Sequence, residues 1–153
     1  MKICLVTAFP PSGRQLNEYG FHLACELQRN PLVNLTILGD KLTSYEWATD
    51  KNGKPLSQDE QRELTGFHVV RCWDSNSLAA PANIAREVRR VRPDVVWFNL
   101  VYSTFATQEH PVAAFAGLCI PALTRSMGYF THVTLHHILE HVDFAGAGVK
   151  QEQ

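Results

Sequence analysis

Short runs of apolar residues alternate along the chain with segments in which apolar residues recur at helical spacing. The first run, residues 2–8, is nearly all apolar, which is typical of a strand buried on both faces of a parallel sheet. Similar runs occupy residues 33–38, 67–72, 95–98 and 133–135. Helices are expected over residues 16–29, 78–91 and 111–127. This order predicts an α/β fold with a mostly parallel sheet.

Glycine and proline residues separate these elements. Pro111 suits the first turn of a helix, because its missing N–H costs nothing there. Pro121 lies inside the same predicted helix and should kink or split it, and Gly128 supplies a left-handed cap at its end. Residues 41–65 are polar and contain an Asn-Gly turn signal, so we expect a long surface excursion there.

Composition narrows the class of protein. A length of 153 residues indicates one domain, and a net charge of −1 gives no field that attracts nucleic acid. The longest apolar segment, residues 111–123, is shorter than the roughly 18 residues that span a bilayer. The cysteines form no C-x-x-C pair, which favours reduced, buried thiols in a cytoplasmic protein. They stand at positions 4, 25, 72 and 119.

Two histidines directly follow the run at 133–135. If that run is a central strand, His136 lies at its carboxyl end, where open α/β sheets bind ligands. Imidazole suits polar or proton chemistry near neutral pH, although a purely structural histidine pair is the alternative. A metal site is a third interpretation, because His137, Glu140 and His141 match the pattern H-x-x-E-H. We rank it last, because few residues remain to supply a further ligand.

Two predicted loops share this edge of the sheet. The first leads into the helix at 16–29, where Gly13 would let a ligand approach the backbone and the helix N-terminus would favour an anion. Its spacing matches neither GxxxxGK[ST] nor GxGxxG, and a plain turn explains it equally well. The second loop, residues 99–107, follows the strand at 95–98, so the two loops would line one crevice. The candidate substrate-binding residues are Ser12, Gly13, Arg14, Asn17, Asn99, Tyr102 and His137.

Three segments together resemble the N-terminal half of family-four, group 1 glycosyltransferases, which have the two-domain GT-B plan. KICLVTAFPPSG and the helix after it resemble the opening strand and the acceptor-side loop. RPDVVWFN resembles the fourth strand, and VTLHHI resembles the V-x-T-x-H strand end. Their order and separations fit the family over residues 1–142.

The resemblance implies that residues 1–142 form a Rossmann-like, three-layer α/β/α domain, half of a GT-B fold. Residues 143–153 would then lead to a C-terminal part absent from this sequence. The implied reaction transfers a sugar from a nucleotide-sugar to an acceptor with retained anomeric configuration, and it requires no cofactor or metal. The N-terminal half would bind mainly the acceptor. His136 would be the catalytic residue, stabilising and positioning the donor sugar and its leaving phosphate without nucleophilic attack.

The sequence also departs from the family pattern. A single Gly13 followed by Arg14 replaces a Gly-Gly pair, and His137 replaces a frequent Asp. Because the half that would stabilise the leaving nucleotide is missing, we expect little turnover from this polypeptide alone. The alternative is a non-catalytic α/β binding or interaction module with a receiver-like plan. A receiver needs an acidic cluster, however, and Asp74 supplies only one carboxylate.

The expected partners follow from these interpretations. A sugar acceptor would bind directly, a nucleotide-sugar mainly through the absent half, and nucleic acid not at all. Arg86, Arg89 and Arg90 share one predicted helix face, which we interpret as solvated surface. The same face leaves open a peripheral contact with a membrane, and homodimer formation also stays open.

Overall fold

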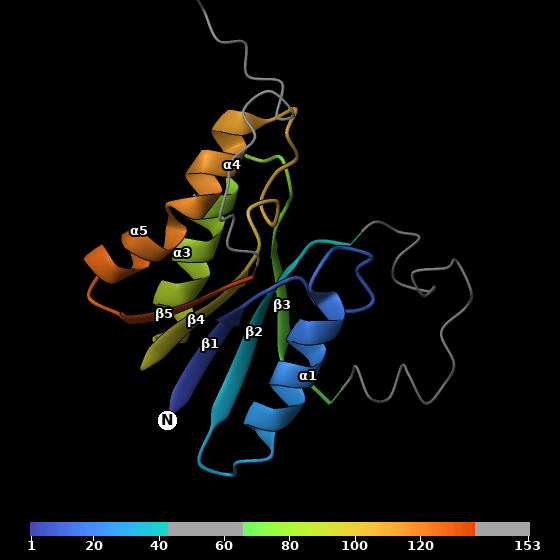
Figure 1. Cartoon of the computed structure of the whole chain (residues 1–153). Coiled ribbons are helices and arrows are strands. Elements are labelled where there is room, and N and C mark those ends of the chain that lie inside the picture. Colours follow the sequence, from blue (N-terminus) through green and yellow to red (C-terminus); the bar gives the residue numbers. More distant parts are fainter. Residues whose placement is uncertain (43–65, 137–153) are drawn as a thin grey trace, which may run out of the picture.

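A computed structural model describes residues 1–42 and 66–136, and this part of the chain forms an α/β fold around one sheet (Figure 1). The sheet has five strands in the order β3-β2-β1-β4-β5, and every neighbouring pair is parallel. The strands are β1 Lys2–Val6, β2 Asn34–Asp40, β3 Val69–Trp73, β4 Val95–Leu100 and β5 Phe130–Leu135. Because all five are parallel, their carboxyl ends lie along one edge of the sheet.

Helices cover both faces of the sheet, which confirms the predicted three-layer α/β/α arrangement. Helix α1 (Asn17–Gln28) lies on one face, and α3 (Ala80–Val91), α4 (Pro111–Leu118) and α5 (Ile120–Ser126) lie on the other (Figure 1). The helix expected at 111–127 is split, as Pro121 predicted. Pro121 occupies the first turn of α5, where its missing N–H breaks no helical hydrogen bond. Gly128 follows α5 with a φ of 92°, a left-handed conformation that glycine adopts without strain.

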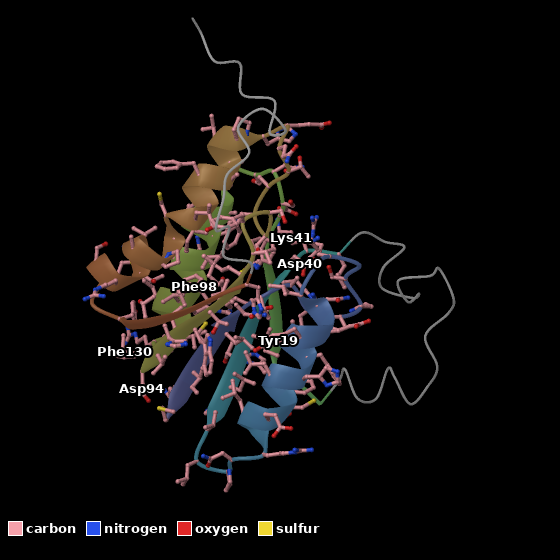
Figure 2. The ribbon with its side chains drawn as sticks, in the orientation of Figure 1. Tyr19, Asp40, Lys41, Asp94, Phe98 and Phe130 are labelled. Atoms are coloured by element: carbon pink, nitrogen blue, oxygen red, sulfur yellow. The ribbon has the colours of Figure 1, made fainter. Side chains whose placement is uncertain are left out.

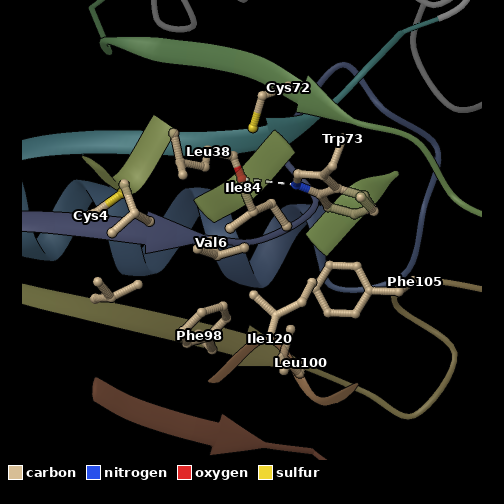
Figure 3. Close-up of a cluster of buried hydrophobic side chains, with 13 residues drawn as sticks. Cys4, Val6, Leu38, Cys72, Trp73, Ile84, Phe98, Leu100, Phe105 and Ile120 are labelled. Atoms are coloured by element: carbon tan, nitrogen blue, oxygen red, sulfur yellow. Dashed lines mark hydrogen bonds between the residues drawn. The ribbon is translucent and has the colours of Figure 1, made fainter. Parts of the chain in front are cut away.

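The larger hydrophobic core lies between the sheet and helices α3 and α5 (Figure 3). Phe98 from β4 and Ile84 from α3 are both fully buried in it. Trp73 is buried there as well, and its indole nitrogen donates a 3.1 Å hydrogen bond to the backbone oxygen of Leu38. Its ring meets that of Phe105 edge-on, with centroids 5.1 Å apart. The core therefore holds the end of β3 and the loop after β4 in one packed unit.

A smaller core lies between the sheet and α1. Leu5 and Ile37 come from neighbouring strands, and Phe9 lies three residues after the end of β1. The Phe9 ring packs against Phe21 of α1 at 6.0 Å and against Phe67 at 5.4 Å, measured between centroids. Phe9 thereby fixes the start of the first loop relative to α1 and the sheet.

Strand β5 occupies an edge of the described sheet, which corrects the expectation of a central strand. It pairs with β4 from Val95 opposite Phe130 to Leu100 opposite Leu135. Helix α5 packs against β5, yet Phe130, Val133 and Leu135 remain exposed. The β-branched, apolar run was therefore a correct signal for a strand but not for its burial.

Two strands extend further than their apolar runs indicated. β2 continues through Gly39 and Asp40, beyond the predicted run at residues 33–38. β4 continues through Asn99 and Leu100, so Asn99 belongs to a strand and not to a polar loop. The reason is pairing with β3 in the first case and with β5 in the second, since backbone hydrogen bonding across the sheet outweighs the polarity of one side chain.

The four cysteines, all within the described residues, form no disulfide, and they differ in exposure. Cys4 on β1 and Cys72 on β3 are buried, as expected. Cys25 in α1 is half-buried, and Cys119 lies exposed between α4 and α5, which corrects the expectation that every thiol is buried. No helix within residues 1–42 and 66–136 is long and apolar enough to cross a bilayer. Most of the predicted excursion, residues 43–65, lies outside the described part.

Candidate functional site

His136 follows β5 directly, at the carboxyl edge of the sheet. Its backbone N–H donates a 2.8 Å hydrogen bond to the carbonyl oxygen of Leu100, which extends the β4–β5 pairing by one step. The residue is half-buried. Its backbone is thus fixed by the sheet, and its ring remains accessible from one side.

Two buried side chains orient the imidazole ring. The Nε2 atom of His136 lies 2.7 Å from Oδ1 of Asn99, and Nδ2 of Asn99 donates a 3.0 Å hydrogen bond to the hydroxyl of Thr7. That hydroxyl donates in turn to the backbone oxygen of Ala8 at 3.0 Å. Asn99 and Thr7 are both fully buried. Because Asn99 must present its oxygen to His136, Nε2 carries the proton and the neutral ring leaves Nδ1 as an acceptor.

Tyr19 completes this arrangement from the first turn of α1. Its ring meets the His136 ring edge-on, with centroids 4.5 Å apart and planes at 74°. The close approach of α1 depends on Gly20, where a Cβ atom would lie 2.7 Å from both the Ala8 oxygen and the Thr7 hydroxyl. We call His136, Asn99, Thr7 and Tyr19 the His136 site.

Asp40, at the end of β2, fixes the first loop on the same edge of the sheet. Figure 2 shows Asp40 and Lys41 at the upper edge, opposite the end of the sheet where Asp94 and Phe130 lie. The carboxylate is fully buried and accepts hydrogen bonds from the backbone N–H of Phe9 at 3.2 Å and from Arg14 Nε at 3.1 Å. It also accepts one from the Ser12 hydroxyl.

Arg71 of β3 reinforces this loop from the opposite side. One of its terminal nitrogens donates to the Phe9 oxygen at 2.7 Å and to the Asp40 backbone oxygen at 3.2 Å. The other donates to the backbone oxygen of Pro10, which precedes Pro11 through a cis peptide bond. Two carbonyls of the loop and its carboxylate partner are therefore hydrogen-bonded within the protein, which holds the loop firmly at the edge of the sheet.

The predicted residues of the first loop consequently have different surroundings. Ser12 was predicted to line an open crevice. It is instead buried, with its hydroxyl bonded to Asp40. Arg14 is paired with Asp40 while 41% of its side chain stays exposed, and Gly13 is exposed. Asn17 donates to the Ser12 backbone oxygen and accepts from the next N–H, which is the local bonding of a helix start.

The second predicted loop supplies an open pocket beside His136. Tyr102 is 45% exposed and lines this pocket, and Ser103 Oγ donates to Oε1 of Gln15 at 3.1 Å. This bond joins the second loop to the first, as the shared crevice predicted. Asn99 is instead buried beneath His136, and His137 lies outside the described residues.

Sequence reasoning missed Thr7, Tyr19, Asp40 and Arg71. The one signal available was a polar residue at the end of a mostly apolar strand: Thr7 directly follows β1, and Asp40 is the last residue of β2. Tyr19 and Arg71 gave no comparable signal, because their partners lie 117 and 31 residues away in the chain.

Neither alternative site is assembled in the described residues. They contain no group of three or more His, Cys, Asp or Glu side chains that could hold a metal ion, and residues 137–141 of the H-x-x-E-H pattern lie outside them. Asp40 is buried and saturated, and Asp74 pairs with Lys41 at 2.8 Å. These two carboxylates therefore do not form the open acidic cluster of a receiver. The sequence matches no protein-family model and no curated protein.

Proposed function

We propose that this chain is the acceptor-side domain of a retaining glycosyltransferase, with His136 at the reacting centre. The observation that carries the proposal is the 2.7 Å bond between Asn99 and His136 at the carboxyl edge of a parallel sheet. Ligands of open α/β sheets bind at this edge. The resemblance of three sequence segments to family-four, group 1 glycosyltransferases supports the same conclusion.

The proposed role of His136 follows from its ring orientation. Asn99 holds the proton on Nε2, so Nδ1 accepts a hydrogen bond from a hydroxyl of the bound sugar while the ring is neutral. Tyr19 packs against the ring and limits its rotation. His136 thus positions the donor sugar and stabilises charge near its leaving phosphate. The ring does not act as the nucleophile.

The electrostatics of the first loop support a division of labour. Arg14 and Arg71 both lie against Asp40, at 3.1 and 3.5 Å, so both side chains are engaged within the protein and the carboxylate offsets one of their two charges. A diphosphate needs cationic or N–H donors that are not already committed. In the proposed enzyme, the second domain of the GT-B plan therefore makes most contacts with the nucleotide-sugar.

The proposal is tested on protein produced from the intact gene. We expect transfer from a nucleotide-sugar to a hydroxyl acceptor, with the anomeric configuration of the product read by NMR. His136→Ala should lower kcat about 10²–10³-fold, the usual effect of losing one electrostatic contact to a transition state. His132→Ala is the matched control. His132 lies on β5, and its ring packs against Trp97, with centroids 4.8 Å apart, and not against the His136 site.

Two results would overturn the proposal. One is unchanged turnover in His136→Ala, which would remove this ring from the reacting centre. The other is tight, stoichiometric binding of a nucleotide-sugar by residues 1–153 alone, which would contradict the division of labour. A product with inverted configuration would reject the retaining mechanism.

A further inference from the structure

A pocket of about 550 Å³ lies next to the His136 site. One of its lining residues is Val101, which follows the Leu100 whose carbonyl accepts the hydrogen bond from the His136 backbone N–H. The volume falls within the ~300–1,000 Å³ typical of small-molecule sites. The lining residues come from the loop after β4, the start of α4 and the first loop, and they are Gln15, Val101, Tyr102, Ser103, Ala106, Thr107, Gln108, Pro111 and Ala114.

Among the residues that the structure describes, none that lines the pocket carries a charge. The polar groups are the amides of Gln15 and Gln108, the hydroxyls of Ser103 and Thr107, and the phenol of Tyr102. Amides and hydroxyls both donate and accept hydrogen bonds, and so do the hydroxyls of a sugar. Binding a phosphate or carboxylate would instead call for arginine or lysine.

The walls of the pocket are partly apolar. Alanine, valine and proline side chains line one part of it, and the half-exposed ring of Tyr102 offers a flat surface. An aromatic ring of this kind pairs an apolar face with a polar tip. A pyranose has the matching character, with C–H groups on its faces and hydroxyls around its rim. Pro111, at the start of α4, also lacks one of the N–H donors that would attract an anion.

The pocket is held in shape before any ligand arrives. Asn76, from the loop between β3 and α3, receives the Thr107 N–H on its side-chain oxygen and donates its own N–H to the Phe105 oxygen, both at 2.8 Å. The Thr104 hydroxyl accepts the Val101 N–H at 2.8 Å. Such preorganisation lowers the entropy lost on binding.

We propose that this pocket binds the acceptor, and that the bound part of the acceptor is an uncharged saccharide ring. That the ligand is the acceptor rests on the proposed function. That the ligand is an uncharged saccharide rests on the pocket alone. A sugar in the pocket would lie beside His136, within the same edge of the sheet.

The test is an NMR titration of the 153-residue chain. The probes are methyl glucoside, maltose and cellobiose, compared with glucose 6-phosphate and glucuronate. We expect the neutral probes to shift the amide signals of residues 101–108, and the anionic probes to bind more weakly. Tyr102→Ala should weaken neutral binding ~2–10-fold through loss of the ring contact. Phe130→Ala removes another exposed aromatic at the far end of β5 and should have no effect.

A charge substitution tests the class of ligand directly. Gln108→Lys should strengthen the binding of glucuronate relative to methyl glucoside, because it adds a cation to an uncharged wall. Tighter binding of glucose 6-phosphate than of methyl glucoside by the unmodified chain would overturn the inference. So would shifts confined to residues outside the pocket, or no shifts at all.

The two proposals fail in distinguishable ways. If neutral saccharides bind this pocket but the intact protein transfers no sugar, the glycosyltransferase proposal falls and the ligand class stands. If sugar transfer depends on His136 but the acceptor is anionic at this pocket, the ligand class falls and the transferase proposal stands.

Discussion

Asn99 lies near the end of β4 and His136 directly after the neighbouring parallel strand β5, and their side chains are joined by a 2.7 Å hydrogen bond. The Asn99 oxygen is committed to His136 because its nitrogen is committed to Thr7. A buried polar chain of this kind fixes one tautomer of the imidazole. The site is thus defined by a bond that the fold assembles, and several measurable consequences depend on it.

Asn99→Ala should release the His136 ring and destabilise the protein. The substitution leaves the Thr7 hydroxyl and the His136 Nε2–H without their partner, which costs about 1–3 kcal/mol. Nitrogen-15 NMR of the ring should show the Nε2–H tautomer in the unmodified chain and a mixture of tautomers in Asn99→Ala. Asn99→Asp keeps the acceptor and should keep the tautomer. Identical ring spectra for Asn99→Ala and the unmodified chain would contradict this account.

Asp40→Ala should destabilise the protein strongly. The carboxylate is fully buried and accepts hydrogen bonds from Phe9, Ser12 and Arg14. Its removal therefore leaves several donors without their acceptor. Breaking a buried charge pair from one side typically costs about 3–5 kcal/mol, measured here by urea unfolding. Asp74→Ala breaks the exposed pair with Lys41 and should cost about 0–1 kcal/mol. Equal losses for the two variants would be inconsistent with the network at Asp40.

Gly20→Ala should destabilise the protein although alanine favours helices. A Cβ atom at this position would lie 2.7 Å from the Ala8 oxygen and the Thr7 hydroxyl, so α1 must move away from β1. Overpacking of this kind costs about 1–3 kcal/mol. The edge-on contact between Tyr19 and His136 should loosen at the same time. Gly13→Ala is the control, since no atom lies within 4 Å of a Cβ there, and a stabilised Gly20→Ala would refute the close approach.

Thiol chemistry should separate the cysteines. Burial raises the pKa of both Cys4 and Cys72 to about 12. Their thiolates are therefore scarce at pH 8, and a disulfide reagent should label Cys119 first and these two only after unfolding. Rapid labelling of all four thiols in the folded chain would argue against this burial.

The same shifts predict how stability depends on pH. Between the unfolded pKa of 9.0 and the folded value of about 12, the folded state keeps protons that the unfolded state releases. The unfolding free energy should therefore be unaffected by these groups below pH 9 and fall as pH rises above it, by up to about 1.4 kcal/mol per pH unit for each thiol. The double variant Cys4→Ala, Cys72→Ala should show a flatter profile in this range.

The sequence by itself determined the type and order of the described elements. Apolar runs indicated all five strands, and helical spacing indicated α1 and α3. Pro121 and Gly128 indicated where the last predicted helix divides and where it ends. These features can be predicted because each depends on local residue type. Burial on both faces requires a run of apolar residues, a missing N–H requires proline, and a left-handed φ favours glycine.

Tertiary structure alone decided the strand ends, the edge position of β5 and the composition of the site. The sequence placed Asn99 in a loop. In the structure it belongs to β4, because it pairs with β5, and its side chain bonds to Thr7 and His136. Asp40 lay beyond the predicted run at 33–38, and only the structure shows that Arg71 and the first loop bond to it. The partners in both cases lie tens of residues apart, and hydrogen bonds across such separations leave no periodic pattern in the sequence.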